Sequence, residues 1–151
     1  MNKIMLSLVT ICSVCLIFSA NAENKNQEKI PAVITRVSDG DTVRAVVGRE
    51  LVSIRLANID CPENRKNEKS YNQIVTFNVQ TADDIKILGK KAKKKLKKLL
   101  DFKEGEITFQ ETPEFVCKGE TRKVGYLYAG DINVNEYMLE NNTCVPFTCK
   151  K

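Results

Sequence analysis

The sequence predicts an α+β domain in which packed helices cover a small, closed or partly closed barrel of five β-strands. Three observations predict this class. Short stretches rich in β-branched residues are separated by turn signals such as Asp39-Gly40 and Gly48-Arg49. One long amphipathic segment follows the first three of these stretches, and a shorter helical segment follows the last two. No internal repeat or low-complexity linker divides the 151 residues, a length that supports one domain with one modest core.

Three consecutive stretches are predicted to form a meander, and two more strands follow the long helix. The five predicted strands cover residues 30–37, 42–47, 51–59, 106–111 and 122–129. In the third strand, apolar residues alternate with polar ones, as expected when successive side chains point to opposite faces of a sheet. The apolar positions are Val52, Ile54 and Leu56. Arg55 is therefore expected on the face opposite this apolar stripe.

A lysine-rich amphipathic helix is predicted between the third and fourth strands. Apolar residues recur there at spacings of 3, 4, 4 and 3, which is the period of a helix. They are Ile85, Leu88, Ala92, Leu96 and Leu99. The other face consists almost entirely of Lys86, Lys90, Lys91, Lys93, Lys94, Lys95, Lys97 and Lys98. Since no aromatic residues interleave with these lysines, a solvated helix surface is favoured over a nucleic-acid contact, although the run could still attract a polyanion.

Two further segments complete the expected fold. Residues 133–136, Asn-Val-Asn-Glu, form a capping pattern that predicts a short helix ending near residue 140. Residues 64–82 begin with a polar, loop-like run, and "IVTFNV" within them fits a short strand or an inserted arm, so their structure stays open. With one helix after the third strand and one after the fifth, the strands fit the OB-type (oligonucleotide/oligosaccharide-binding) barrel.

The first 22 residues have the features of a secretory signal peptide. Lys3 provides a positive start, residues 4–18 are almost continuously apolar, and residues 20–22 (Ala-Asn-Ala) fit a small-x-small cleavage site. An uncleaved membrane anchor is the alternative, but the apolar run is shorter than the roughly 20 residues that span a bilayer. We therefore expect a secreted or periplasmic mature domain, residues 23–151, without stable membrane association. Its 23 basic and 19 acidic side chains leave a formal net charge of +4, which permits a polyanionic partner.

Four cysteines remain after cleavage: Cys61, Cys117, Cys144 and Cys149. In an oxidising compartment they can form up to two disulfides, and all three pairings stay open. A zinc site is disfavoured, because Cys144 and Cys149 do not have the spacing of a CxxC pair and the chain contains no histidine. Free thiols are the remaining alternative.

The absence of histidine restricts the chemistry that the chain can perform. It excludes nucleophilic systems built on Ser-His-Asp or Cys-His, and metal hydrolases with histidine ligands. Catalysis would have to use carboxylates, arginine, lysine, tyrosine or a metal bound through oxygen. Two acidic segments, "VSDGDTVRA" at 37–45 and "IRLANIDCPEN" at 54–64, place carboxylates close to Arg55. Each acidic residue alone could also be an ordinary turn former or surface charge.

Four motifs resemble those of the staphylococcal nuclease (thermonuclease) family in order and approximate spacing. They are "SDGDTV", "IRLANIDCPE", "GKKAKKKLKKLL" and "RKVGYLYAGDINVNEYML". The resemblance spans roughly residues 32–142. It implies a five-stranded OB-type barrel with packed helices, and a monomeric calcium-dependent phosphodiesterase. Such a hydrolase would cleave DNA and RNA, with single strands preferred.

The resemblance also implies the ligands of a calcium ion. Asp41 and Asp60 would supply carboxylate oxygens, and Cys61 its backbone carbonyl oxygen. Asp39 would lie near the ion without binding it directly. Calcium takes about 6 to 8 oxygen ligands, so this set leaves positions for water and for a phosphate oxygen. A site with so few protein ligands is expected to bind calcium weakly, which suits a calcium-rich extracellular setting.

Three more residues receive roles in phosphodiester hydrolysis from the resemblance. Arg55 and Arg122 would bind the scissile phosphate, because a guanidinium can donate two parallel hydrogen bonds to phosphate oxygens. Glu63 would orient or deprotonate the attacking water, since no histidine is present for that task. Together with the metal ion, the two arginines would stabilise negative charge that grows on the phosphoryl oxygens.

The chain departs from the family pattern in ways that leave other functions open. Threonine is common in the family where this chain has Cys61, and a disulfide there would make activity redox-sensitive. The segment after Asn64 is longer than in the best-known member of the family. Where that member has a further C-terminal helix, this chain has a short tail, which a disulfide could hold in place. The alternatives are a nuclease-like barrel that binds nucleic acid or protein without cleavage, and a disulfide-stapled structural domain.

Overall fold

The computed structural model describes residues 28–101, 106–112, 116–117 and 119–148. The predicted signal peptide at 1–22 and Cys149 lie outside these ranges. The described strands are β1 (Ile30–Val37), β2 (Thr42–Val47), β3 (Glu50–Leu56), β4 (Ile59–Asp60), β5 (Ile107–Glu111), β6 (Lys123–Ala129), β7 (Ile132–Asn133) and β8 (Val145–Pro146). The described helices are α1 (Glu68–Thr76), α2 (Ala82–Asp101) and α3 (Val134–Glu140).

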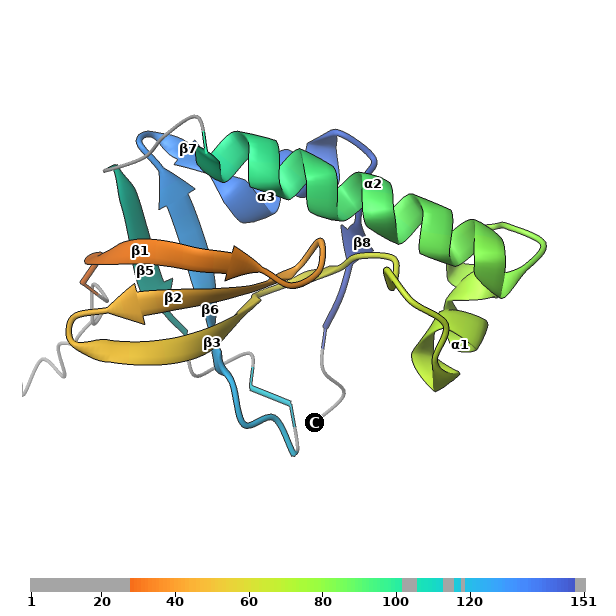
Figure 1. Cartoon of the computed structure of the whole chain (residues 1–151), viewed down its shortest axis with the longest axis horizontal. Coiled ribbons are helices and arrows are strands. Elements are labelled where there is room, and N and C mark those ends of the chain that lie inside the picture. Colours follow the sequence, from red (N-terminus) through yellow and green to blue (C-terminus); the bar gives the residue numbers. More distant parts are fainter. Residues whose placement is uncertain (1–27, 102–105, 113–115, 118, 149–151) are drawn as a thin grey trace, which may run out of the picture.

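Five of the strands close into a barrel (Figure 1). Strands β3, β2, β1, β5 and β6 follow one another with antiparallel pairing. Strand β3 then pairs with β6 in parallel, with Arg55 opposite Val124, and this pairing closes the barrel. Closure removes the free edges that an open sheet would present. The OB-fold-like α+β architecture with packed helices is therefore confirmed.

The predicted third strand is interrupted, and the segment left open is helical. Strand β3 ends at Leu56, and Asn58 adopts a left-handed backbone with φ of 61°, which asparagine tolerates better than most residues. The chain turns there and resumes as β4, which pairs with β8. Within 64–82, the fragment "IVTFNV" forms the end of α1 and the turn after it. A reciprocal cap between Asn67 and Ser70 starts this helix.

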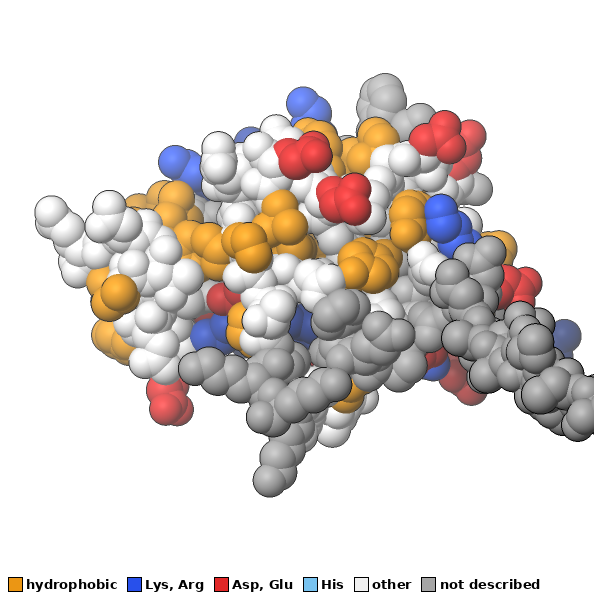
Figure 2. Space-filling model, turned by 180° about the vertical axis from the view of Figure 1, so that it is seen from behind, with side chains coloured by type: hydrophobic (Ala, Val, Ile, Leu, Met, Phe, Trp, Pro, Cys, Tyr) orange, Lys and Arg blue, Asp and Glu red, His pale blue; other side chains and the backbone are white. Residues whose placement is uncertain are grey.

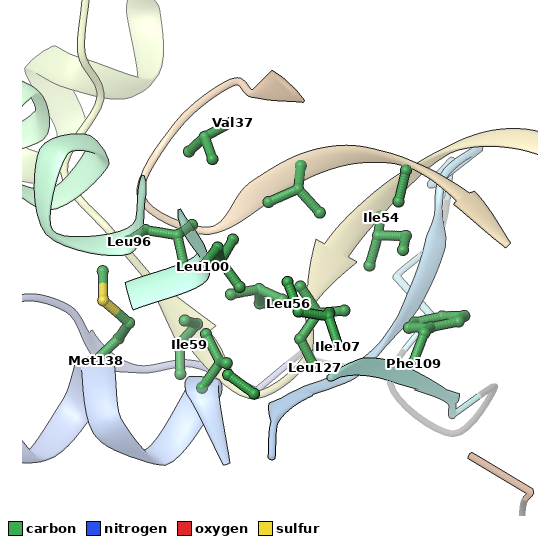
Figure 3. Close-up of a cluster of buried hydrophobic side chains, with 14 of the residues drawn as sticks. Val37, Ile54, Leu56, Ile59, Leu96, Leu100, Ile107, Phe109, Leu127 and Met138 are labelled. Atoms are coloured by element: carbon green, nitrogen blue, oxygen red, sulfur yellow. The ribbon is translucent and has the colours of Figure 1, made fainter. Parts of the chain in front are cut away.

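Helices α2 and α3 pack against the barrel and complete one hydrophobic core (Figure 3). Leu96 and Leu100 of α2 and Met138 of α3 point toward the barrel side chains. The largest barrel contributions are all buried: Ile54, Leu56, Ile107, Phe109 and Leu127. Since full burial of one such side chain stabilises the fold by about 1.5–3 kcal/mol, this cluster holds barrel and helices together as one unit.

The buried face of α2 differs in detail from the predicted apolar stripe. Leu88 and Leu99 are only partly buried, whereas Gly89 and Leu100 are buried. Gly89 allows α2 to approach the backbone at Glu63 closely, because a Cβ at this position would lie 2.3 Å from the carbonyl oxygen of Glu63. The helix therefore rests directly on the backbone that carries Glu63. The lysines of the opposite face are exposed or partly exposed, in agreement with a solvated surface.

A disulfide joins the C-terminal tail to the second acidic motif. Cys61 and Cys144 are bonded, with their Cα atoms 4.2 Å apart. Strand β8 pairs with β4 beside this bond, with Val145 opposite Asp60. Cys117 is also disulfide-bonded. The cysteines of the described ranges are thus oxidised, as the sequence predicts, and the tail is fixed next to the acidic cluster.

One face of the molecule shows hydrophobic side chains in a broken band (Figure 2). Acidic and basic side chains border this band, and basic groups do not gather on the described part of this face. The described part of this face therefore offers little concentrated positive charge to a polyanion. Among the described residues, none of the helices has the length and apolarity needed to cross a membrane.

Candidate active site

Strand pairing brings the two acidic motifs together at one end of the barrel. Asp41 immediately precedes β2, and its carbonyl oxygen accepts a hydrogen bond of 2.8 Å from the Leu56 N–H. The next residue, Thr42, lies opposite Arg55 in the pairing of β2 with β3. Asp60 follows on the short β4. Because the register of β2 and β3 determines these positions, Asp41 and Arg55 lie next to each other without any contribution from a ligand.

Asp41 is a buried carboxylate, 3% exposed, whose oxygens both accept hydrogen bonds. Its Oδ2 accepts from the Cys61 N–H at 2.9 Å and forms an ion pair with Arg55. Its Oδ1 accepts from the hydroxyl of Thr42 at 3.0 Å. Burial raises the pKa of Asp41, but the Arg55 guanidinium, with smaller help from Lys69 and the Cys61 N–H, outweighs burial and holds that pKa below its ordinary value. The carboxylate is therefore ionised at neutral pH.

Arg55 connects Asp41 to the second carboxylate, Asp60. Its Nη2 lies 3.1 Å from Asp60 Oδ1 and donates a further bond of 3.0 Å to the Ile59 carbonyl oxygen. Burial lowers the pKa of this guanidinium, but the two carboxylates more than compensate and raise it. An arginine held on several sides by buried acceptors has a defined orientation, which is a requirement for a phosphate-binding group.

Gln73 of α1 contacts three residues of the second acidic motif with one side-chain amide. Its Nε2 donates to Asp60 Oδ2 at 2.8 Å and to the Cys61 carbonyl oxygen at 2.9 Å. Its Oε1 accepts from the Glu63 N–H at 2.9 Å. The orientation of the amide follows from these partners, because a flipped amide would place its oxygen against two acceptors. Gln73, 3% exposed, thereby holds Asp60 and Cys61 with their oxygens directed to one point.

Glu63 lies at the edge of the same cluster and is held by two residues that precede or begin α1. Its Oε2 accepts from Asn67 Nδ2 at 2.8 Å, and its Oε1 lies 3.0 Å from the ammonium of Lys69. Lys69 also contacts Asp60 Oδ1 at 2.7 Å. Burial lowers the pKa of Lys69, but the nearby Asp41 and Asp60 outweigh it and raise that pKa. The ammonium is therefore charged in this position.

Sequence reasoning did not identify Asn67, Lys69 or Gln73 as residues of the site. Two signals were available. Asn67 followed three residues later by Ser70 is a helix-start pattern. Lys69 and Gln73 are four residues apart, a spacing that places both on one face of a helix. Which structure that face would contact could not be read from the sequence.

Arg122 lies beside the cluster and reaches it through a hydroxyl group. Its Nη1 donates to Thr42 Oγ1 at 3.2 Å, and Thr42 in turn donates to Asp41. Its remaining guanidinium nitrogens bind Glu120, with Nε at 2.7 Å from Oε1 and Nη2 paired with Oε2. The hydrogen bonds from Arg122 lower the pKa of Glu120 to about 2. The guanidinium thus has a carboxylate partner, in addition to its contact with Thr42.

Asp39 lies in the β1–β2 turn, and its Oδ1 is buried without a hydrogen-bond partner among the described residues. Burial raises the pKa of Asp39, the charges of Glu63 and Asp41 raise it further, and the nearby Arg65 and Lys93 offset this only in part. A carboxylate in this situation favours an additional cation nearby. The ion pairs of Arg55 are with Asp41 and Asp60, and the expected place of Asp39 near a metal ion stays a prediction.

The oxygen atoms of this cluster fit a calcium ion by their chemistry. Among the described residues, no three His, Cys, Asp or Glu side chains form a metal-binding group. The expected set requires only two such side chains, Asp41 and Asp60, because its third member is the main-chain carbonyl of Cys61. Asp60 Oδ2 and the Cys61 carbonyl oxygen both accept from the Gln73 amide nitrogen, so a calcium ion shared by these two oxygens would take the place of this donor. Hard oxygen donors with a buried, unpartnered Asp39 nearby suit a hard divalent cation.

A closed five-stranded barrel with packed helices and an Asp–Arg–Asp–Glu cluster at one end defines an OB-fold-like domain with a polar, partly buried site. The family model for staphylococcal nuclease homologues matches residues 53–145 of this chain, which is more than half of its length. The chain belongs to the staphylococcal nuclease homologue family, a family of nucleases and nucleic-acid-binding domains. A search of curated proteins finds no match.

Proposed function

We propose that this chain is a secreted, calcium-dependent nuclease that hydrolyses phosphodiester bonds of DNA and RNA, with single strands preferred. The observation that carries the proposal is the convergence of Asp41, Arg55, Asp60 and Glu63. These residues come from two separate motifs and form one network, in which Lys69 of α1 joins Glu63 to Asp60. Family membership supports the reaction class.

The arginine in this network is suited to hold the scissile phosphate. Arg55 has the shape to donate paired hydrogen bonds to a phosphate, and its fixed position costs little further ordering when substrate binds. Asp41 and Asp60 keep it oriented, and they would hold calcium together with the Cys61 carbonyl oxygen. When bound, calcium supplies positive charge next to the phosphoryl oxygens.

Glu63 is the carboxylate best placed to act as general base. Asp41 and Asp60 are both engaged with Arg55, whereas Glu63 contacts Asn67 and Lys69 at the edge of the cluster. Its side chain is 14% exposed, so a water molecule can reach it. A carboxylate within hydrogen-bond reach of that water can accept its proton as the oxygen attacks phosphorus.

A barrel that binds nucleic acid or protein without cleavage is the second candidate. One observation favours it: Arg122, the second expected phosphate ligand, is paired with Glu120. A phosphate would have to displace this carboxylate to receive both arginines. If Arg122 stays with Glu120, transition-state stabilisation falls to Arg55 and the metal ion.

Secretion is proposed from the features of residues 1–22 and is supported by the Cys61–Cys144 bond. Disulfides persist in oxidising compartments and are rare in the cytosol. We propose a monomeric mature domain in the periplasm or the medium, where calcium is abundant.

The proposal is tested by digestion of single-stranded DNA with the purified, oxidised protein. We expect cleavage in calcium, none with excess chelator, and loss of cleavage in Glu63→Gln. Glu68→Gln is the matched control, because Glu68 is exposed on α1, and it should cleave like the wild type. Calcium should also raise the melting temperature by mass action, which the structural-domain alternative does not predict. If the calcium-loaded protein binds DNA but cleaves none, the binding module is correct.

A further inference from the structure

Lys69 places an ammonium group between two carboxylates of the site. Its Nζ lies 2.7 Å from Asp60 Oδ1 and 3.0 Å from Glu63 Oε1. The side chain of Lys69 is 44% exposed, whereas Asp60 and Glu63 are 11% and 14% exposed. A half-exposed cation thus neutralises two carboxylates that have little contact with solvent.

This ammonium and a calcium ion compete for the same carboxylate. Asp60 Oδ1 already accepts from Lys69 and from Arg55 Nη2 at 3.1 Å. A calcium ion on Asp60 would lie about 2.3–2.6 Å from one of its oxygens, and therefore only a few ångströms from Nζ. Like charges at that separation in a partly buried site repel strongly. Binding of calcium at Asp60 therefore disfavours the present position of the Lys69 ammonium, and the ammonium in turn disfavours calcium.

Of the two basic residues on Asp60, Lys69 is the one that can leave. Arg55 is 11% exposed and is also bound to Asp41 and to the Ile59 carbonyl oxygen. Lys69 ends in a strongly hydrated ammonium on a flexible four-carbon stem, so moving into solvent costs it little. After it moves, it stays tethered to α1 at the rim of the site, within reach of a nucleic-acid strand bound at Arg55.

We infer that Lys69 is an exchangeable cation of this site: it neutralises Asp60 and Glu63 in the metal-free protein, is displaced when calcium binds, and then binds a backbone phosphate of the nucleic-acid strand. This inference rests on the proposed function. It assigns a substrate-binding residue to helix α1, which lies between the motif that ends at Glu63 and the lysine-rich helix α2. A phosphate contact by a lysine also releases a condensed counterion, which contributes to affinity.

Lys66 provides a matched control in the same segment. Its ammonium pairs with Asp83 at 2.6 Å, and both side chains are well exposed, 47% and 60%. A pair of this kind is screened by solvent and contributes little. Substitution of Lys66 or Lys69 by methionine removes the same charge and keeps a similar stem, so any difference between the two variants reports on position and not on net charge.

The first experiment is calorimetric titration of calcium alone into the mature wild type, Lys69→Met and Lys66→Met. We expect Lys69→Met to bind calcium roughly tenfold more tightly, the size of effect that one close charge has on a neighbouring ionic equilibrium. Lys66→Met should bind like the wild type. Lys69→Gln, which keeps polarity without charge, should behave as Lys69→Met does and guards against a folding defect. Equal calcium affinity of all four proteins, or equal gains in both methionine variants, would overturn the inference.

The second experiment follows the ammonium group itself and then the substrate. The NMR signal of the Lys69 ¹⁵N-labelled ammonium should shift when calcium is added, while that of Lys66 should not. In saturating calcium, Lys69→Met should reduce the slope of log KM against log salt for single-stranded DNA by about 0.7, the value for one lost phosphate contact. An unchanged ammonium signal or an unchanged slope contradicts the exchange. The calcium titration does not require nuclease activity. If the protein cleaves no DNA but calcium still displaces Lys69, the proposed nuclease function is wrong, while the competition between calcium and Lys69 stands.

Discussion

Gln73 is the residue on which the hydrogen bonds of Asp60, Cys61 and Glu63 converge. Its single amide satisfies a buried carboxylate oxygen, a backbone carbonyl and a backbone N–H at once. A buried polar group left without its partner costs far more than an exposed one, because water cannot replace the lost bond. The geometry of the site therefore depends on a side chain of α1 as well as on the two acidic motifs.

We predict that Gln73→Ala lowers the free energy of unfolding by about 1–3 kcal/mol, the cost of leaving buried donors and acceptors unpaired. Urea unfolding measures this as a lower midpoint with an unchanged slope. Asn72→Ala is the control, because Asn72 is exposed on the same helix. Equal midpoints for the two variants would show that the amide network does not stabilise the fold.

The Glu120–Arg122 ion pair should make stability depend on acid pH. The pKa of Glu120 is about 2 in the folded protein, against an ordinary value of 4.5. A depressed pKa means that the pair contributes fully above about pH 4.5, and that its contribution is lost as the pH falls toward 2. Glu120→Gln should therefore remove part of the acid destabilisation seen in the wild type.

Urea midpoints of the wild type and Glu120→Gln between pH 6 and about 2 test this linkage. The difference between the urea midpoints of the two proteins should shrink as the pH falls from about 4.5 toward 2. In an Arg122→Gln background the pH-dependent difference should be smaller, since the largest cause of the shift is then absent. A constant difference at all pH values would contradict the prediction.

Helix α2 positions the site by lying against backbone as well as against the core. At Gly89, two effects of adding a methyl group oppose each other. Alanine favours a helix interior over glycine by about 1 kcal/mol. A Cβ at Gly89, however, would lie 2.3 Å from the Glu63 carbonyl oxygen and 2.6 Å from the Asn64 nitrogen. Backbone cannot move away as a flexible side chain can, so the clash outweighs the propensity.

We predict that Gly89→Ala destabilises the protein by more than about 1 kcal/mol in net terms, the order of an overpacked contact. It should also reduce nuclease activity, because Glu63 is displaced with its backbone. Thermal unfolding and DNA digestion measure the two effects. Lys90→Ala, on the exposed face of the same helix, should change neither. A stabilised Gly89→Ala protein would mean that helix propensity prevails.

Across the whole molecule, the Cys61–Cys144 bond connects the acidic motif to the tail over a sequence separation of 83 residues. In the chain-entropy account, closing a loop of this length destabilises the unfolded chain by about 4.5 kcal/mol. The pairing of β4 with β8 beside the bond means that the tail also supports Asp60. Stability and site geometry should therefore both respond to this disulfide.

We predict that the double variant Cys61→Ser/Cys144→Ser loses about 2–4 kcal/mol of unfolding free energy, the usual range for a structural disulfide. Guanidinium unfolding measures the loss. Calcium affinity and nuclease activity should also fall, because the bond fixes the backbone that carries the expected ligand oxygen of residue 61. A reducing agent should likewise lower the stability, the calcium affinity and the nuclease activity of the wild type. If the variant and the reduced wild type keep full activity, the site is not redox-sensitive.

Local patterns were sufficient for much of the fold. Alternating β-branched residues predicted the barrel strands, and helical spacing predicted α2, because both signals depend on neighbours in the sequence. The boundaries moved where a tertiary contact intervened: β3 stops at Leu56 because Asn58 turns the chain toward β8. Helix α1 was not predicted, since its polar face has no apolar period and is buried against carboxylates of another segment.

The residue types of the site were determined by the sequence: two motifs supply its carboxylates and Arg55, a third motif supplies Arg122, and the chain has no histidine. Their arrangement depends on the tertiary structure. The register of β2 with β3 places Asp41 next to Arg55, closure of the barrel places Arg122 beside Thr42, and α1 adds Lys69 and Gln73. The pairing of Cys61 with Cys144 also required the fold, since a disulfide forms only where the Cα atoms approach within about 7 Å. Distances across a closed barrel depend on all of its strands together, and a linear pattern of residues does not contain them.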